Sequence, residues 1–202
     1  ESSLTIADGG DMITGGTLTV GGDGTGTLDV SGAITTTGTV TIGSGETGTG
    51  TVSVTGTMTT SQGNLIVGAL GDGRLSVGQA GGARADLVTT VGSVGIAIGQ
   101  GSTGLVDVWN GDMITGGDLA VGGAGEATLT IHNGRLETGG SVIVAAEGTS
   151  TGTVGVTNGD MATGGDLVVG GDGDATLDIT NGDLDTGGSV VVAAGETSTS
   201  TV

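Results

Sequence analysis

The sequence predicts an all-β chain wound into a right-handed parallel β-helix (β-solenoid) of about eight coils. Each coil is expected to contain three short strands and roughly 23–25 residues. Two observations carry this prediction. Segments 105–152 and 153–200 align without a gap and are identical at 33 of 48 positions, which is typical of stacked structural repeats. The chain also has 49 glycines that recur every few residues among Val, Ile and Thr, a composition that disfavours helices and favours strands.

The repeat extends over the chain and divides it into eight units of similar pattern. Seven of the units are nearly equal in length, and the fourth is longer because it contains an insertion within 78–94. We expect residues 1–202 to form a single solenoid domain and to be a segment of a longer array. The units are 3–26, 27–50, 51–73, 74–104, 105–127, 128–152, 153–175 and 176–200.

Each unit repeats one order of strands and turns. In a first strand such as Leu129, Thr130 and Ile131, alternation points the outer two residues inward and the middle one outward. The first strand is followed by an Asn-Gly turn and a segment with one apolar residue, such as Leu136. A Thr-Gly-Gly corner then leads into a second strand, such as 142–144. Such strands cannot bury a core alone, so we expect parallel, in-register stacking of coils. Antiparallel hairpins are the alternative, but they do not require the pattern to return with each unit.

In-register stacking predicts ladders of like side chains along the solenoid axis. Successive Asn amides are expected to bond to one another at the Asn-Gly corner, and successive Thr hydroxyls are expected to stack before the Gly-Gly corner. The amide ladder comprises Asn110, Asn133, Asn158 and Asn181, and the hydroxyl ladder comprises Thr115, Thr138, Thr163 and Thr186.

Stacked carboxylates give one candidate metal site. Asp160 and Asp183 are expected to lie over one another, which is unfavourable without a cation, so weak Ca²⁺ binding is an alternative to a site-free surface. Arg135 shares their position in the stack and is expected to lie between Asp neighbours. Segments 21–29 and 170–178 are similar to the calcium-binding nonapeptide of β-rolls, but they lack its sixth-position Asp and its nine-residue period.

Charge and composition exclude several function classes. The net charge of −19 repels phosphate groups, so we expect no nucleic-acid partner, and no apolar run is long enough to insert into a membrane as a helix. His132 is the single histidine, Cys and Tyr are absent, and no aromatic sugar platform accompanies the paired carboxylates. We therefore expect no enzymatic activity and no cofactor. The lack of cysteine fits an extracellular chain and an intracellular one equally.

The insertion in the fourth unit is the most site-like feature, because insertions in a repeat tend to carry interactions. It contains Arg84 and Asp86, and the same unit contains Arg74. Trp109 and His132 occupy equivalent positions in adjacent units and are expected to stack on the surface. We take Arg74, Arg84, Asp86 and Trp109 as candidate residues for binding an unknown surface ligand. The alternative is a tolerated insertion without a role.

Units such as GGDLAVGGAGEATLTIHNGRLETGGSVIV resemble the Gly/Thr-rich repeats in passenger regions of bacterial autotransporters and related large surface adhesins. The resemblance covers nearly the whole chain. It implies a right-handed parallel β-helix held outside the cell, often as a stalk. The 202 residues contain neither a recognisable translocator barrel nor an adhesive tip, so the resemblance does not extend to autotransport itself.

These observations favour a structural segment of an extracellular bacterial surface protein, acting as a stiff rod. Two alternatives belong to other classes. In the first alternative, the chain is a self-assembling subunit of a filament or surface layer and stacks on copies of itself end to end or laterally. In the second, it is a weak Ca²⁺-binding module.

Overall fold

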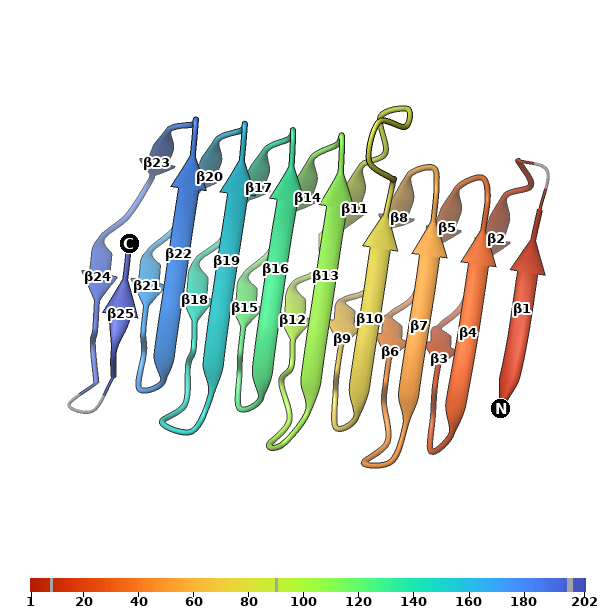
Figure 1. The fold of residues 1–202 in the computed structure, drawn as a ribbon, viewed down its shortest axis with the longest axis horizontal. Coiled ribbons are helices and arrows are strands. Elements are labelled where there is room, and N and C mark those ends of the chain that lie inside the picture. Colours follow the sequence, from red (N-terminus) through yellow and green to blue (C-terminus); the bar gives the residue numbers. More distant parts are fainter. Residues whose placement is uncertain (8, 90, 196–197) are drawn as a thin grey trace.

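The computed structural model, which describes residues 1–7, 9–89, 91–195 and 198–202, confirms the all-β solenoid (Figure 1). Its strands form three parallel sheets of nine, eight and eight strands, here named A, B and C. Sheet A contains β1 (Ser2–Ile6), β4 (Thr25–Val30), β7 (Thr49–Val54), β10 (Asp72–Val77), β13 (Thr103–Trp109), β16 (Glu126–His132), β19 (Thr151–Thr157), β22 (Asp174–Thr180) and β25 (Ser200–Thr201).

Sheets B and C are built from the two shorter strands of each coil. Sheet B contains β2 (Met12–Thr14), β5 (Ile34–Thr36), β8 (Met58–Thr60), β11 (Leu87–Thr89), β14 (Met113–Thr115), β17 (Leu136–Thr138), β20 (Met161–Thr163) and β23 (Leu184–Thr186). Sheet C contains β3 (Leu18–Val20), β6 (Val40–Ile42), β9 (Leu65–Val67), β12 (Val94–Ile96), β15 (Leu119–Val121), β18 (Val142–Val144), β21 (Leu167–Val169) and β24 (Val190–Val192).

The coils wind as a right-handed helix. In Figure 1 the chain runs up the near face in sheet A, turns back at the top into sheet B, and descends the far side through sheet C. It then returns to the near face one strand further from the N-terminal end. The termini therefore lie at opposite ends of the stack (Figure 1).

The strands pair in the register that the repeat predicts. Thr103 of β13 pairs with Glu126 of β16, and Glu126 pairs with Thr151 of β19, so each residue lies beside its equivalent in the next coil. The β16 strand spans Glu126–His132, which is longer than the three-residue strand expected, and it begins before the unit boundary at 128. The longer strand gives each coil more backbone hydrogen bonds to its neighbours.

Inward side chains from all three sheets form one continuous core. Leu129 and Ile131 are fully buried, and the intervening Thr130 faces outward, as the alternation predicts. Leu129 lies in register between Val106 and Val154, which are also fully buried. Of the residues that the structure describes, only Leu, Val, Ile, Met and Ala fill the apolar core, because a close-packed interior of this width leaves no room for rings.

The Asn-Gly corners are built differently from a hairpin turn. Each Asn of the amide ladder adopts a left-handed conformation, with φ of 55–56°, while the following glycines do not have positive φ. Gly134 is instead required by packing, because a Cβ there would overlap the carbonyl oxygen of Gly111 in the preceding coil. The Asn-Gly pair therefore combines one αL residue with one point of close backbone contact between coils.

The hydroxyl ladder is longer than predicted and lies inside the solenoid. Thr115, Thr138 and Thr163 are buried, and the register extends their row to every coil. The complete row is Thr14, Thr36, Thr60, Thr89, Thr115, Thr138, Thr163 and Thr186.

Two members of this row differ in hydrogen bonding and provide a matched pair of substitutions. The buried Thr115 Oγ1 has no partner among the described residues, whereas Thr163 Oγ1 donates to the Gly165 carbonyl at 2.9 Å. Thr115→Val removes an unsatisfied buried hydroxyl and is expected to raise the free energy of unfolding by about 1 kcal/mol. Thr163→Val removes a hydrogen-bonded hydroxyl and is expected to lower the free energy of unfolding by about 1 kcal/mol. Urea melts measure both changes. Equal effects at the two sites would show that these hydrogen bonds do not matter.

Candidate functional site

The predicted Asn ladder is present at the first corner of four successive coils. Asn133, Asn158 and Asn181 each donate from Nδ2 to Oδ1 of the preceding Asn, at 2.9 Å in every case. The first member, Asn110, donates to the carbonyl of Gln79 at 2.9 Å. The ladder therefore begins on the insertion of the fourth unit and continues without interruption to the last coil.

Earlier coils use hydroxyls at this corner. Between the inward Val30 and Ile34 the corner comprises 31–33, whereas between the inward Val108 and Met113 it comprises 109–112, which is longer by one position. The Ser31 hydroxyl accepts from the Gly9 amide at 2.8 Å, and the hydroxyl of the next coil donates to the Ser31 carbonyl, from Thr55 at 2.6 Å.

A second ladder, absent from our sequence-based expectations, lies at the corner before sheet C. Here a side-chain oxygen accepts the backbone N–H of the equivalent residue in the next coil. Asp118 Oδ1 accepts from Ser141 N at 2.9 Å, Ser141 Oγ from Asp166 N at 3.1 Å, and Asp166 Oδ1 from Ser189 N at 2.8 Å. Asp and Ser alternate, so carboxylates are about two coil rises, or about 10 Å, apart. In the sequence, this ladder is marked by GGD and GGS segments that alternate from coil to coil.

The candidate calcium ligands have a structural role at the first corner. Asp160 Oδ1 accepts the backbone N–H of Asp183 at 2.9 Å, so the two residues are joined without a cation. Arg135 lies between Asp112 and Asp160 in the stack, as predicted, and its backbone N–H donates to Asp112 Oδ1 at 2.8 Å. Its guanidinium, however, pairs with Glu137 of the following strand at 2.9 Å. Within the described ranges, no three His, Cys, Asp or Glu side chains are grouped closely enough to hold a metal ion.

The insertion forms a loop, 78–86, that connects β10 to β11. The same connection in the preceding coil comprises only 55–57. Arg84 ties the loop to the next coil by an ion pair with Asp112 at 2.5 Å, and it also pairs with Asp86 of its own loop at 3.1 Å. The hydrogen bond and charge of Asp112 raise the pKa of Arg84 above its usual value, so the guanidinium stays charged. Arg84 and Asp86 are thus brought together, as partners of each other.

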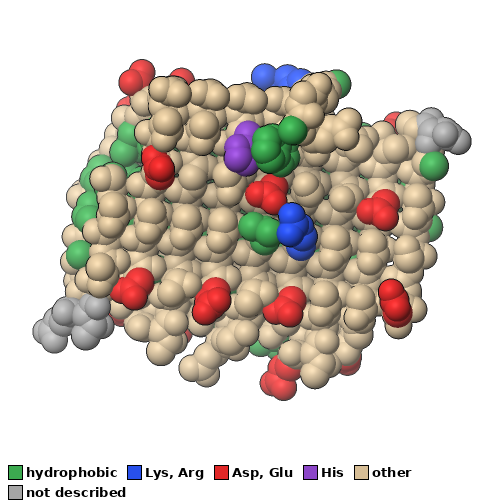
Figure 2. Space-filling view, viewed as in Figure 1, with side chains coloured by type: hydrophobic (Ala, Val, Ile, Leu, Met, Phe, Trp, Pro, Cys, Tyr) green, Lys and Arg blue, Asp and Glu red, His purple; other side chains and the backbone are tan. Residues whose placement is uncertain are grey.

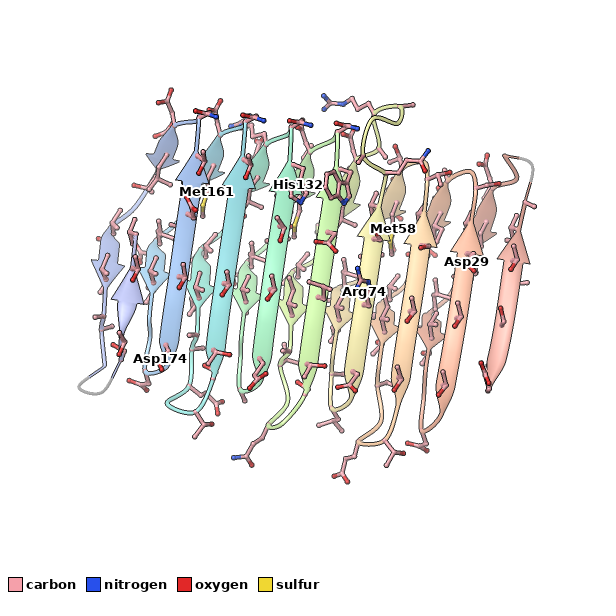
Figure 3. The ribbon with its side chains drawn as sticks, in the orientation of Figure 1. Asp29, Met58, Arg74, His132, Met161 and Asp174 are labelled. Carbon is pink, nitrogen blue, oxygen red and sulfur yellow. The ribbon has the colours of Figure 1, made fainter. Side chains whose placement is uncertain are left out.

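The other two candidates lie on the outer face of sheet A. Arg74 is exposed and pairs with Asp107 of the next coil at 3.4 Å. Its in-register neighbour is Leu105, which stands where β16 and β19 have threonine. Figure 3 shows Arg74 near the middle of this face and His132 closer to the first corner.

Trp109 and His132 stack on each other, as predicted. Their ring centroids are 3.7 Å apart and their planes differ by 17°. In the next two coils of the same row the residues are Thr157 and Thr180. Figure 2 shows hydrophobic, basic, histidine and acidic side chains gathered near the centre of a face whose remaining side chains are mostly of other types, with scattered acidic ones. We call Arg74, Leu105, Trp109 and His132 the sheet A cluster.

A shallow groove crosses the same face along the solenoid axis. It has a volume of about 530 Å³ and lies between two rows of outward side chains from β7 to β19. One wall carries Asp72, Thr103 and Glu126, and the other carries Arg74 and Leu105 of the sheet A cluster. The Thr103 hydroxyl donates to Asp72 at 2.6 Å. The groove is open, has polar and apolar lining in similar amounts and is acidic on one side. Sequence reasoning did not identify it.

Comparisons with models of protein families, with curated proteins and with solved structures find no match. None of the described segments is a helix long and apolar enough to cross a membrane.

Proposed function

We propose that this chain is a structural rod in an extracellular bacterial surface protein, of the adhesin or autotransporter-passenger type. Its role is mechanical, to hold other parts of the protein at a distance from the cell. The supporting observation is the unbroken in-register pairing of three sheets from the first coil to the last. Each internal coil is hydrogen-bonded to both neighbours along three sides, which favours a stiff element over a flexible linker.

The corner ladders support the same proposal. The Asn ladder and the Asp/Ser ladder add side-chain hydrogen bonds at corners where no strand pairing holds the coils together. Most of these side chains form contacts between coils and do not line a cavity that could hold a ligand.

Electron microscopy of the purified chain tests the rod directly. Nine strands in sheet A at about 4.8 Å spacing give a rod about 38 Å long. We expect separate rods of this length. Long fibres would instead support assembly.

Assembly into a filament is the second candidate. Copies that stack along the solenoid axis would continue the parallel strand pairing that already joins each coil to its neighbours. A calcium-binding role has no third ligand beside Asp160 and Asp183 among the described residues, and we do not propose it.

We further propose that the sheet A cluster is where the rod contacts a surface ligand, because Trp and Arg carry much of the energy of protein interfaces. A variant with Arg74→Thr, Leu105→Thr and Trp109→Thr restores the residue type of the neighbouring coils. We expect it to match the wild type in stability to within about 1 kcal/mol, since only positions on the outer face change. We also expect beads coated with this variant to be retained on cell surfaces less than beads coated with the wild-type chain. Equal retention would refute a role for the cluster.

A further inference from the structure

The Asn ladder consists entirely of Asn-Gly pairs, which are chemically labile in flexible chains. The backbone nitrogen of the glycine attacks Cγ of the asparagine, the side-chain amide leaves as ammonia, and a succinimide ring forms. Water then opens the ring to aspartate or isoaspartate. Glycine favours this reaction because it leaves the attacking nitrogen unhindered and its backbone mobile.

We propose that the ladder is a latent modification site, at which stacking of the coils suppresses deamidation and separation of the coils permits it. The four sites are Asn110, Asn133, Asn158 and Asn181.

The first restraint is the hydrogen bonding of each side chain. In the middle of the ladder, Asn133 donates from Nδ2 to Asn110 and accepts at Oδ1 from Asn158, both at 2.9 Å. These bonds hold the amide along the solenoid axis. Ring closure requires Cγ to turn toward its own backbone, so both bonds must break first.

The second restraint is the packing of the following glycine. Gly134 lies so close to the Gly111 carbonyl that not even a Cβ would fit between them. The attacking nitrogen therefore cannot move toward Cγ without separating the two coils. Asn133 and Asn158 are exposed to solvent, so protection comes from geometry and not from exclusion of water.

Deamidation at one site weakens the ladder. Conversion of Asn158 to aspartate replaces the Nδ2 donor by a carboxylate oxygen, which then faces the Asn133 Oδ1 acceptor. The new charge also adds to the net charge of −19. Because the change is irreversible, the modification records past opening of the coils and makes further opening easier.

Peptide mapping by mass spectrometry tests the proposal on the 202-residue chain, incubated at mildly alkaline pH either folded or in guanidinium chloride. We expect Asn133 and Asn158 to deamidate about 30-fold more slowly in the folded chain, the factor that two net hydrogen bonds correspond to. Asn181, whose amide has a ladder neighbour on one side only, should react first among the folded sites. Equal rates in the folded and unfolded chains would overturn the proposal.

Asn158→Gly distinguishes protection by the ladder from protection by folding in general. Glycine accepts the φ of 55° at this position, so the variant is expected to keep the fold while it removes the side-chain amide. The variant removes one hydrogen bond from Asn133 and one from Asn181 and leaves Asn110 unchanged. We expect deamidation at Asn133 and Asn181 to accelerate about five-fold, the factor for one net hydrogen bond, with Asn110 as the internal control. Unchanged rates at both neighbours would show that the ladder does not protect them.

Discussion

Replacing Gly159 with alanine is expected to lower the free energy of unfolding by about 3 kcal/mol, the upper end of the range for overpacking. A Cβ at this position would overlap the backbone carbonyl of Gly134 in the preceding coil. Neither group can move without breaking the pairing of the two coils, because the carbonyl belongs to the backbone and the backbone at position 159 fixes the position of the Cβ. Chemical denaturation followed by circular dichroism measures the loss.

Gly155→Ala is the matched control, on the first strand of the same coil. Gly155 faces outward on β19, and the nearest atom to its Cβ would be a Thr130 methyl at an ordinary 3.8 Å. Alanine there is expected to be neutral or to stabilise by up to about 1 kcal/mol, because it reduces the entropy of the unfolded chain. If the two substitutions had equal effects, close contact between coils at the corner would not explain the need for glycine.

Leu129→Ala is expected to cost about 3 kcal/mol. Leu129 is fully buried and lies in register between Val106 and Val154, so truncation leaves a cavity in the middle of the stack that its neighbours cannot fill. Thermal or urea unfolding measures the change.

Thr130→Ala on the adjacent outward position is the control for Leu129→Ala. It is expected to change stability by less than about 1 kcal/mol, since outward strand positions have small effects. A large loss from Thr130→Ala, or a negligible one from Leu129→Ala, would contradict the assignment of inward and outward faces.

Much of the fold follows from the repeat alone. Once like residues must stack on like, the period determines the parallel register, and alternation at Leu129, Thr130 and Ile131 determines which side chains enter the core. The Asn ladder then follows from geometry, and so does the stacking of Trp109 on His132. These predictions succeed because each depends only on which residues occupy equivalent positions in adjacent coils.

Other features depend on directions that the repeat does not specify. Asp118 and Ser141 accept backbone N–H groups because the corner points those groups along the axis. The alternating GGD and GGS segments mark the stacked positions, but they do not indicate the direction of the N–H groups. For the same reason the sequence suggests Asp160 as a cation ligand, although its carboxylate accepts the Asp183 amide. The departure of Leu105 from threonine is visible in the alignment of the repeats, where it lies opposite Thr153. The alignment alone does not show that Leu105 lies beside Arg74 on the outer face, which the strand pairing establishes.

Spin-label distances along sheet A test the central claim, in-register stacking of the whole chain, most directly. The chain has no cysteine, so labels can be placed at outward threonines in the pairs Thr27–Thr176 and Thr51–Thr176. Six and five strand steps at about 4.8 Å predict narrow distributions near about 29 and about 24 Å, differing by one coil rise. Thr27 and Thr51 are paired neighbours in adjacent coils, so broad distributions, or a difference between the two distances far from one coil rise, would contradict the solenoid.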